Sequence, residues 1–251
     1  MKNLRRDFLL SLFSFSGIFF YCRHMPIWNE LKSLIVPIQC IRCSLSDVII
    51  CAECKKYFLE SPENRPRFLS TKIGEPAIAS HLPFSSDVSR LILGAKDSGN
   101  KILESVLLNS LLQTRNLFPS KLILVPIPSR RKARLMRGRD FLFEMCKTIA
   151  RISGDEVVPL LAIARQVSAQ KSLNANERLQ NMRGAFEIRR DLLYSFHDSF
   201  ELRKILIVDD VLTTGATMRE GFRALGAGGA RCIGGISAAY SLNWSMSRLA
   251  H

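Results

Sequence analysis

Two adjacent carboxylates follow directly on a run of apolar residues in "ILIVDDVLTTGAT", residues 205–217. Asp209 and Asp210 repel each other when both are charged. A fold that keeps them together at a strand end is therefore expected to use them to bind a ligand. The loop after them offers small side chains, hydroxyls and backbone N–H groups to a phosphate, in front of a predicted helix N-terminus. Its residues are Thr213, Thr214, Gly215, Ala216 and Thr217. Since carboxylates accept hydrogen bonds from sugar hydroxyls, the motif predicts a ribose 5-phosphate site.

A plainer interpretation is that the Asp and Thr residues only cap the helix that follows, a position where both are common. One aspartate alone would favour capping, whereas two aspartates, three threonines and a glycine in this order favour binding. The motif closely resembles the 5-phosphoribosyl-1-pyrophosphate (PRPP) motif of type I phosphoribosyltransferases. The resemblance implies that Asp209 and Asp210 contact the ribose hydroxyls, that residues 213–217 hold the 5-phosphate, and that Mg²⁺ accompanies the pyrophosphate.

A basic segment follows the apolar run "KLILVPIP", residues 121–128. Six of the eleven residues 129–139 are Lys or Arg, and no acidic residue occurs between Ser105 and Arg139. Cations at the carboxyl end of a strand next to the acidic pair could bind the pyrophosphate of PRPP, and Arg130 and Arg137 are the candidates. A solvated, basic helix start is the alternative for any single arginine.

Four cysteines lie in a C-x₂-C-x₇-C-x₂-C pattern, at Cys40, Cys43, Cys51 and Cys54. Two such pairs supply four thiolates in a tetrahedron, which is the closed ligand set of a structural Zn²⁺ site. Buried unpaired cysteines or a redox pair are the alternatives, and the second needs one pair rather than two. The other three cysteines, Cys22, Cys146 and Cys232, stand in apolar surroundings and are expected to be core or leader residues.

The elements that must position these residues alternate between strands and helices. Helical periodicity covers residues 87–113 with a break at "GAKDSGN", and further helices are expected within 134–154, 174–186 and 217–230. Strands are expected at 121–128, 156–165, 204–210 and 231–240. This order predicts an α/β fold in which a parallel sheet carries helices on both faces.

The basic segment and the cysteines together resemble the ComF family, also described as amidophosphoribosyltransferase-like, over roughly residues 37–240. The chain shares with that family a "PxP" strand end followed by basic residues, although Arg139 and Asp140 replace part of an Arg-Gly-Phe-Asn-Gln helix start. Its second pattern falls on Arg165, Gln170, Arg178, Asn181 and Gly184, in a region that forms a mobile loop over the site in related transferases. The resemblance implies a type I phosphoribosyltransferase-like fold with a small N-terminal Cys₄ zinc module.

Composition sets the broader class. The chain has 251 residues, 47% of them apolar, and a formal net charge of +14, which favour a globular protein with an anionic partner such as phosphate, nucleic acid or a membrane surface. Seven cysteines, four of them in one cluster, argue against a secreted disulfide framework and favour the cytoplasm. We expect an apolar leader at 1–35, the zinc module at 36–60, a linker at 61–83 and the phosphoribosyltransferase-like domain at 84–251.

The leader allows several interpretations. Its apolar stretch, Phe8 to Tyr21, has the length of a signal-peptide core and is too short for an ordinary membrane span. A start at Met25 would make residues 1–24 an extension or an artefact, and an interfacial anchor is the remaining alternative. No stable membrane span is expected.

Two functions from different classes remain open. The first is phosphoribosyl transfer, which works by positioning and electrostatics and needs none of the four histidines, all of which lie outside the motifs. The second is a non-catalytic role in which the fold binds single-stranded DNA. The ComF resemblance implies DNA uptake during natural competence alongside a helicase partner, and the positive charge suits the phosphate backbone.

Overall fold

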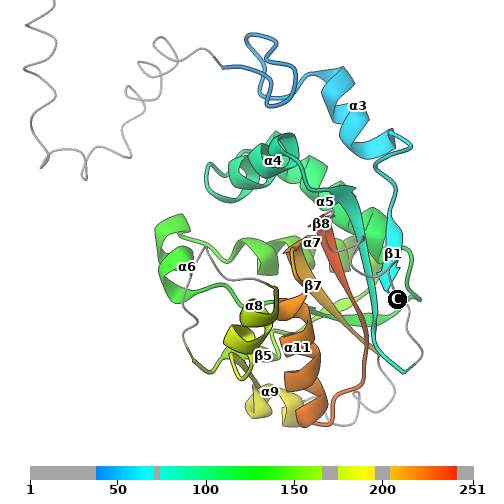
Figure 1. Cartoon of the computed structure of the whole chain (residues 1–251), viewed down its shortest axis with the longest axis vertical. Helices are drawn as coiled ribbons and strands as arrows, with labels where there is room; N and C mark the ends of the chain where they lie inside the picture. The colour runs from blue at the N-terminus through cyan, green and yellow to red at the C-terminus, as the bar shows by residue number, and fades with distance from the viewer. Residues whose placement is uncertain (1–37, 71–73, 166–174, 196–203, 242–251) are drawn as a thin grey trace, which may run out of the picture. The chain divides into compact units, whose positions relative to one another are not determined.

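The four apolar residues before the acidic pair lie on the central strand, β7 (Lys204–Leu212), of the computed structural model (Figure 1). Parallel strands flank it on both sides, β3 (Leu122–Pro126) and β8 (Cys232–Tyr240). Residues 205–208 are fully buried. Both faces of this strand are covered, which is why it needs a continuous apolar run rather than an alternating one.

The structure describes residues 38–70, 74–165, 175–195 and 204–241. Its main sheet has six strands in the order β1-β2-β8-β7-β3-β4, parallel except for β1 at the edge. The strands not yet introduced are β1 (Arg67–Ser70), β2 (Ala77–Pro83) and β4 (Glu156–Val157). The predicted parallel sheet is confirmed.

Helices cover both faces of this sheet. The helices in the described part of the chain are α3 (Ala52–Glu60), α4 (Ser86–Lys96), α5 (Lys101–Arg115), α6 (Arg131–Arg137), α7 (Phe141–Ser153), α8 (Ala175–Met182), α9 (Arg190–Ser195) and α11 (Ala216–Ala227). Two consecutive glycines on β8 show which helix lies on which side: a Cβ on Gly234 would meet Phe118, just after α5, at 2.6 Å, and one on Gly235 would meet Met218 of α11 at 2.3 Å. Neighbouring strand residues point to opposite faces, so α5 and α11 cover opposite sides.

The break expected at "GAKDSGN" separates α4 from α5. Asn100 caps α5, because its side chain accepts hydrogen bonds from the backbone N–H groups of Ile102 and Leu103. We call residues 94–100 the elbow. A Cβ on Gly94 would lie 2.4 Å from Leu103 Cδ1, so the elbow folds back tightly on the first turn of α5.

Two segments differ from their expected form. Part of the segment expected to be a linker, 61–83, forms β1 and β2, and β2 lies deep in the sheet. The polar residues Ser80 and His81 interrupt its apolar pattern, yet both are buried and hydrogen-bonded, Ser80 to Ser237 and His81 to Ser110.

The single strand expected at 156–165 is two strands in two sheets. β4 ends before Pro159, and β5 (Leu161–Ile163) pairs antiparallel with β6 (Phe186–Ile188) in a separate two-stranded sheet. Proline has no N–H for a strand ladder, so the chain leaves the main sheet there.

A buried ion pair joins the end of α5 to the start of β3. Asp155 accepts from Arg115, from the Ser153 hydroxyl at 2.6 Å and from the Leu122 N–H at 2.9 Å. Burial alone would raise the pKa of Asp155, but these donors outweigh it and lower the pKa. The carboxylate is therefore charged and fully satisfied at neutral pH.

The chain divides into two units, Met1–Ile49 and Ile50–His251. In the first, the described residues form a tight turn in which Gln39 and Ser46 make an antiparallel bridge and Cys40 N–H donates to Leu45 O at 2.8 Å. The expected leader, 1–35, and the loop position Gln170 lie outside the described residues. Among the helices that the structure describes, none combines the length and the apolar character that crossing a membrane requires.

Candidate functional site

The acidic pair, Asp209 and Asp210, lies near the carboxyl end of β7, where the parallel strands of the main sheet end. Asp209 is paired in register with Ser237 of β8 and keeps 9% of its surface exposed. Its Oδ1 accepts the N–H of Asp210 at 2.8 Å, and Asp210 Oδ1 accepts the N–H of Val211 at 3.0 Å. We call these two residues the acidic clamp.

Lys96, the last residue of α4, forms an ion pair with Asp210 Oδ2. Burial, followed by the neighbouring charge of Asp210, raises the pKa of Asp209 well above its usual value. Burial would also raise the pKa of Asp210, but the Lys96 ammonium outweighs it, and the pKa of Asp210 is lowered. The two carboxyl groups of the clamp therefore differ in charge. Asp210 is the more readily ionised, and Asp209 keeps its proton to a higher pH than an ordinary aspartate does.

Two arginines from the basic segment hold the elbow on either side of Lys96. Arg137 Nε donates to Asp97 Oδ1 at 2.9 Å, and Arg139 Nη2 donates to the carbonyl oxygen of Ala95 at 2.9 Å. Residues 95, 96 and 97 are therefore each tied to another element, which fixes the backbone from which Lys96 reaches the clamp.

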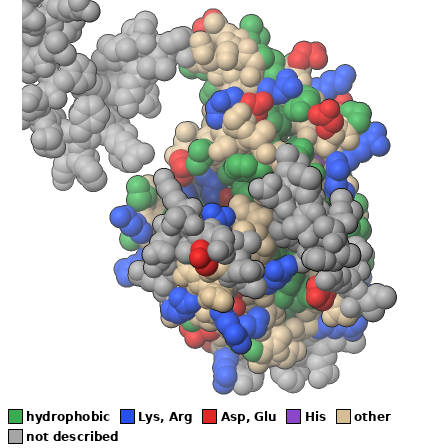
Figure 2. Space-filling view, viewed as in Figure 1, with side chains coloured by type: hydrophobic (Ala, Val, Ile, Leu, Met, Phe, Trp, Pro, Cys, Tyr) green, Lys and Arg blue, Asp and Glu red, His purple; other side chains and the backbone are tan. Residues whose placement is uncertain are grey.

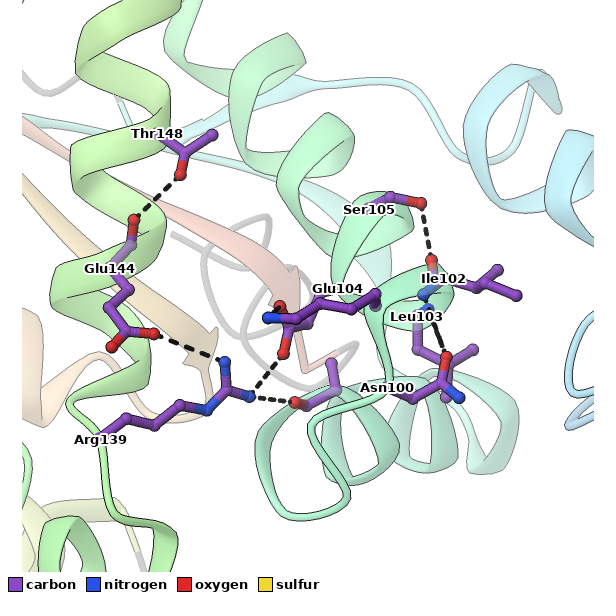
Figure 3. A network of polar contacts seen from close by, with 10 residues as sticks. Asn100, Ile102, Leu103, Glu104, Ser105, Arg139, Glu144 and Thr148 are labelled. Carbon is purple, nitrogen blue, oxygen red and sulfur yellow. Dashed lines mark hydrogen bonds and ion pairs between the residues drawn. The ribbon is translucent and has the colours of Figure 1, made fainter.

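Arg139 joins three helices at once (Figure 3). Its guanidinium lies 2.6 Å from Glu104 Oε1 of α5 and 3.5 Å from Glu144 Oε2 of α7, in addition to the α4 carbonyl. It also stacks over the Phe141 ring, 5.1 Å from the centroid. This residue departs from the ComF pattern, and in this chain it has a structural use.

The clamp and the basic segment line one small cleft of about 200 Å³. Its described lining includes the predicted residues Asp209, Asp210, Arg130 and Arg137, together with Lys96. β3 and β7 run parallel, with Pro126 opposite Val208, so their carboxyl ends meet at this edge. The structure brings together these four predicted residues from segments about eighty positions apart in the sequence.

The loop after the clamp leads into α11 through a left-handed residue. Gly215 has φ 74°, a conformation that favours glycine, and Thr214 Oγ1 accepts the Ala216 N–H at 3.4 Å. Thr213 is exposed, Ala216 is buried, and Thr217 lines a second, larger cavity of about 970 Å³. The expected helix N-terminus therefore stands behind the loop.

The larger cavity lies between the segment around α6 and the two-stranded sheet β5–β6. Glu220 of α11 fixes that sheet, since its buried carboxylate accepts the Phe186 N–H at 3.3 Å and pairs with Arg223 at 2.7 Å. Arg223 in turn donates to the Phe186 carbonyl at 3.1 Å. Burial would raise the pKa of Glu220, but Arg223 and the backbone donors lower it.

The second ComF pattern is described only in part. Arg165 donates to the carbonyl oxygens of Asn181 at 2.6 Å and Arg183 at 2.7 Å, which ties the end of β5 to the end of α8. Gly184 has φ 73°, in the left-handed region. Arg178 lies on α8 and is half-buried.

Lys96 is a residue of the cleft that the sequence motifs did not predict. A lysine at the end of an amphipathic helix is ordinarily a solvated cap, and nothing in its neighbourhood marked it as facing an acid 114 positions later. The signal available was the break after it, "DSGN", which turns the chain at that point.

The four cysteines of the C-x₂-C-x₇-C-x₂-C pattern come together. The Sγ atoms of Cys40, Cys43, Cys51 and Cys54 all lie within 4.8 Å of one another. Four thiolates at this spacing could hold one Zn²⁺. Burial raises the pKa of the thiols of Cys232 to about 12 and of Cys146 above that, so neither is a reactive thiolate.

Residues 144–241 match the model of the phosphoribosyl transferase domain. The crystal structure of adenine phosphoribosyltransferase from Leishmania tarentolae is similar at 16% sequence identity and a TM-score of 0.33, covering 72% of this chain and 86% of that chain. No curated protein matches the chain. The domain match includes β7, the acidic clamp and the loop after it. Together with the parallel sheet, it gives the chain a type I phosphoribosyltransferase-like fold, as predicted.

The two clamp residues are expected to affect stability in opposite directions. Because the folded pKa of Asp209 is raised, its ionisation destabilises the folded state as the pH rises above the unfolded value of about 4. Asp209→Asn removes this charge and keeps the acceptor oxygen, so the midpoint of thermal unfolding at pH 7 should increase by a few degrees, roughly 1 kcal/mol. The gain should shrink at pH 4, where the unfolded state also binds protons.

Asp210→Asn is the matched variant. It leaves Lys96 without its acidic partner in a partly exposed site, and the free energy of unfolding should fall by about 1–2 kcal/mol at pH 7. Urea unfolding of both variants measures the difference. A shift of the same sign in both would contradict the division of charge between the two carboxylates.

Proposed function

We propose that the cleft binds PRPP together with Mg²⁺ and that the chain is a phosphoribosyltransferase. One observation carries the proposal: Asp209 and Asp210 lie at the carboxyl edge of the sheet in the same cleft as Arg130, Arg137 and Lys96, and the clamp lies in the segment that matches the phosphoribosyl transferase domain. The cleft thus places carboxylates, which accept from sugar hydroxyls, beside cations, which pair with phosphates. This charge pattern is complementary to a phosphorylated sugar.

In this proposal the clamp accepts hydrogen bonds from the ribose hydroxyls, and residues 213–217 hold the 5-phosphate with backbone N–H groups and hydroxyls. Arg130, Arg137 and Lys96 face the pyrophosphate. Mg²⁺ would supply a hard cation for the pyrophosphate oxygens, and the carboxylates at this edge offer the oxygen ligands that it prefers.

Lys96 and Arg137 already have acidic partners, Asp210 and Asp97. A pyrophosphate arriving in the cleft would compete for both cations, so binding exchanges one set of ion pairs for another. The elbow supplies both Lys96 and the Arg137 partner, which makes it the element that responds to the ligand.

Transfer itself follows from positioning. The nucleophile of an acceptor forms a bond to the anomeric carbon of the ribose, the bond from that carbon to the pyrophosphate oxygen breaks, and pyrophosphate leaves with the electron pair while the acceptor gives up a proton. The cations stabilise the charge that develops on the leaving group. His81 takes no part, because burial lowers its pKa and both ring nitrogens are engaged, with Asn64 O at 2.6 Å and Ser110 Oγ at 2.9 Å.

The cysteine group supports a structural role for zinc in this proposal. Four thiolates leave no open position for catalysis, and a reducing compartment such as the cytoplasm would keep them available. Zinc is then a folding element of the segment 38–61 and not part of the transfer.

A second candidate is binding of single-stranded DNA within a ComF-type role in natural competence, with a helicase partner. The observation that favours it is α6, whose residues include Arg131, Lys132, Arg134 and Arg137 and of which none is buried. Figure 2 shows Lys and Arg side chains exposed in this region of the molecule. Such a helix can contact a phosphate backbone, and the net charge of +14 agrees with it.

Isothermal titration calorimetry with PRPP and Mg²⁺ tests the first candidate. Wild-type protein should bind PRPP, and the double variant Asp209→Asn, Asp210→Asn should bind it roughly 100-fold more weakly, because neutral amides replace the carboxylates that accept from the ribose hydroxyls. Asp87→Asn, which changes an aspartate in the first turn of α4, is the matched control and should bind as wild type does. Wild-type protein that fails to bind PRPP in the presence of Mg²⁺ would refute the proposal.

Metal analysis of purified protein tests the zinc assignment. We expect one zinc ion per chain, and Cys54→Ser should release it, since three thiolates leave the tetrahedron incomplete. Cys232→Ser, on β8, should retain the metal. Zinc retained in full by Cys54→Ser would exclude this site.

A gel-shift series with a single-stranded oligonucleotide across salt concentrations tests the second candidate. Binding to the phosphate backbone should weaken steeply from 50 to 200 mM salt, by about 10³-fold if six or more phosphates are contacted. Absent or salt-insensitive binding would reject it.

A further inference from the structure

The larger cavity of about 970 Å³ adjoins the cleft of the clamp and shares a wall with it. Ile127, Pro128, Ser129 and Arg130 line both spaces. If the cleft holds PRPP, as proposed above, a transferase must hold its acceptor beside the ribose. The neighbouring cavity has that position, and its size is within the range of small-molecule sites.

Positive side chains surround this cavity. They come from two separate parts of the fold, the segment around α6 and the ends of the two-stranded sheet, and they are Arg130, Arg131, Lys132, Arg134, Arg165 and Arg189. Among the described residues that line the cavity, Asp140 is the acid. The cavity therefore has a strong excess of positive charge, which attracts an anion.

Arg189 pairs with Asp191 at 2.9 Å, but other cations of the cavity have no acid against them. Arg131 and Lys132 are exposed and have no hydrogen bond or ion pair within the described part of the chain. Arg134 is 3.7 Å from Asp140, a long and half-exposed pair. Arg165 is held by two backbone carbonyls, which fix its guanidinium without neutralising it.

The remaining wall is apolar. Leu161 and Phe186 of the two-stranded sheet, Phe143 of α7, Pro159 and Met182 line it. Apolar and aromatic walls fit a flat ring, whereas the cations fit a group that the ring carries. A neutral ring would contact the apolar walls and leave the cations without an anionic partner.

We propose that the cavity binds the acceptor and that this acceptor is an anion, a small planar nitrogen compound that carries a carboxylate or a phosphate. The ring lies on the apolar wall, and the anionic group lies among the cations of α6 and Arg165. A ring nitrogen takes the ribose from PRPP, the acceptor loses a proton from that nitrogen or from an amino group conjugated with it, and pyrophosphate leaves with the electron pair of the broken C–O bond.

Two matched ligand pairs test the charge requirement, orotate against uracil and adenosine 5′-monophosphate against adenosine. Binding is measured by calorimetry with Mg²⁺ and ribose 5-phosphate present, because ribose 5-phosphate can occupy the clamp without transfer. In at least one pair the anionic member should bind about tenfold more tightly than the neutral one, as for a charge-assisted contact. Equal binding within both pairs overturns the proposal.

The double variant Arg131→Gln, Lys132→Gln should lose this preference and bind the two members of a pair alike. Since no residue of α6 is buried, the thermal unfolding midpoint of the variant should match that of wild type. The affinity of the variant for PRPP should stay within about threefold of the wild-type affinity. Lys204→Gln is the control, because Lys204 is exposed at the opposite end of β7. A preference that survives in the α6 variant contradicts the assignment to these cations.

The experiment separates the two proposals. Protein that binds PRPP but none of the four acceptor probes refutes the anionic acceptor and leaves the proposed function standing. Protein that binds no PRPP refutes the proposed function itself, and the inference with it. An oligonucleotide that binds where the mononucleotide does not assigns the cations to nucleic acid and also overturns the proposal.

Discussion

The structure depends on one electrostatic constraint, which is that two adjacent carboxylates lie near the carboxyl end of β7, a strand whose two faces are covered. Asp209 and Asp210 cannot both keep a full charge there unaided, so the fold brings a lysine to one of them and leaves the other with a raised pKa. The lysine comes from the end of a helix far away in the sequence. Its placement requires that helix to stop at a defined residue and point in a defined direction.

The elbow meets this requirement through the basic segment. Arg137 and Arg139 hold Asp97 and the Ala95 carbonyl, and Arg139 also reaches Glu104 and Glu144 on two further helices. A segment with six cations in eleven residues thus has two uses in one stretch of chain. Some of its arginines hold the scaffold, and others face open space.

This division gives the two cavities different electrostatic character. In the smaller cleft, acids and cations are interleaved and partly paired, so an anion that bound there would exchange partners within an existing set of charges. The ion pairs already present lower the cost of burying charge in this cleft. In the larger cavity the lining cations far outnumber the acids, and Glu220, which holds the neighbouring two-stranded sheet, is already paired with Arg223 and the Phe186 N–H. Charge there is available to a ligand.

The sequence by itself determined the sheet, the acidic clamp, the loop after it and the cysteine group, because each depends on residues near one another in the chain. A run of four apolar residues must lie in a doubly covered strand, and C-x₂-C pairs bring thiolates together over fifteen positions. The partner of the clamp and the strand β2 were decided by the tertiary structure. Lys96 and Asp210 are 114 positions apart in the sequence. His81 and Ser80 are tolerated in a buried strand because they form hydrogen bonds with Ser110 and Ser237, which come from distant parts of the chain. Local pattern carries information about burial and backbone direction, whereas the pairing of distant polar groups exists only once the chain has closed on itself.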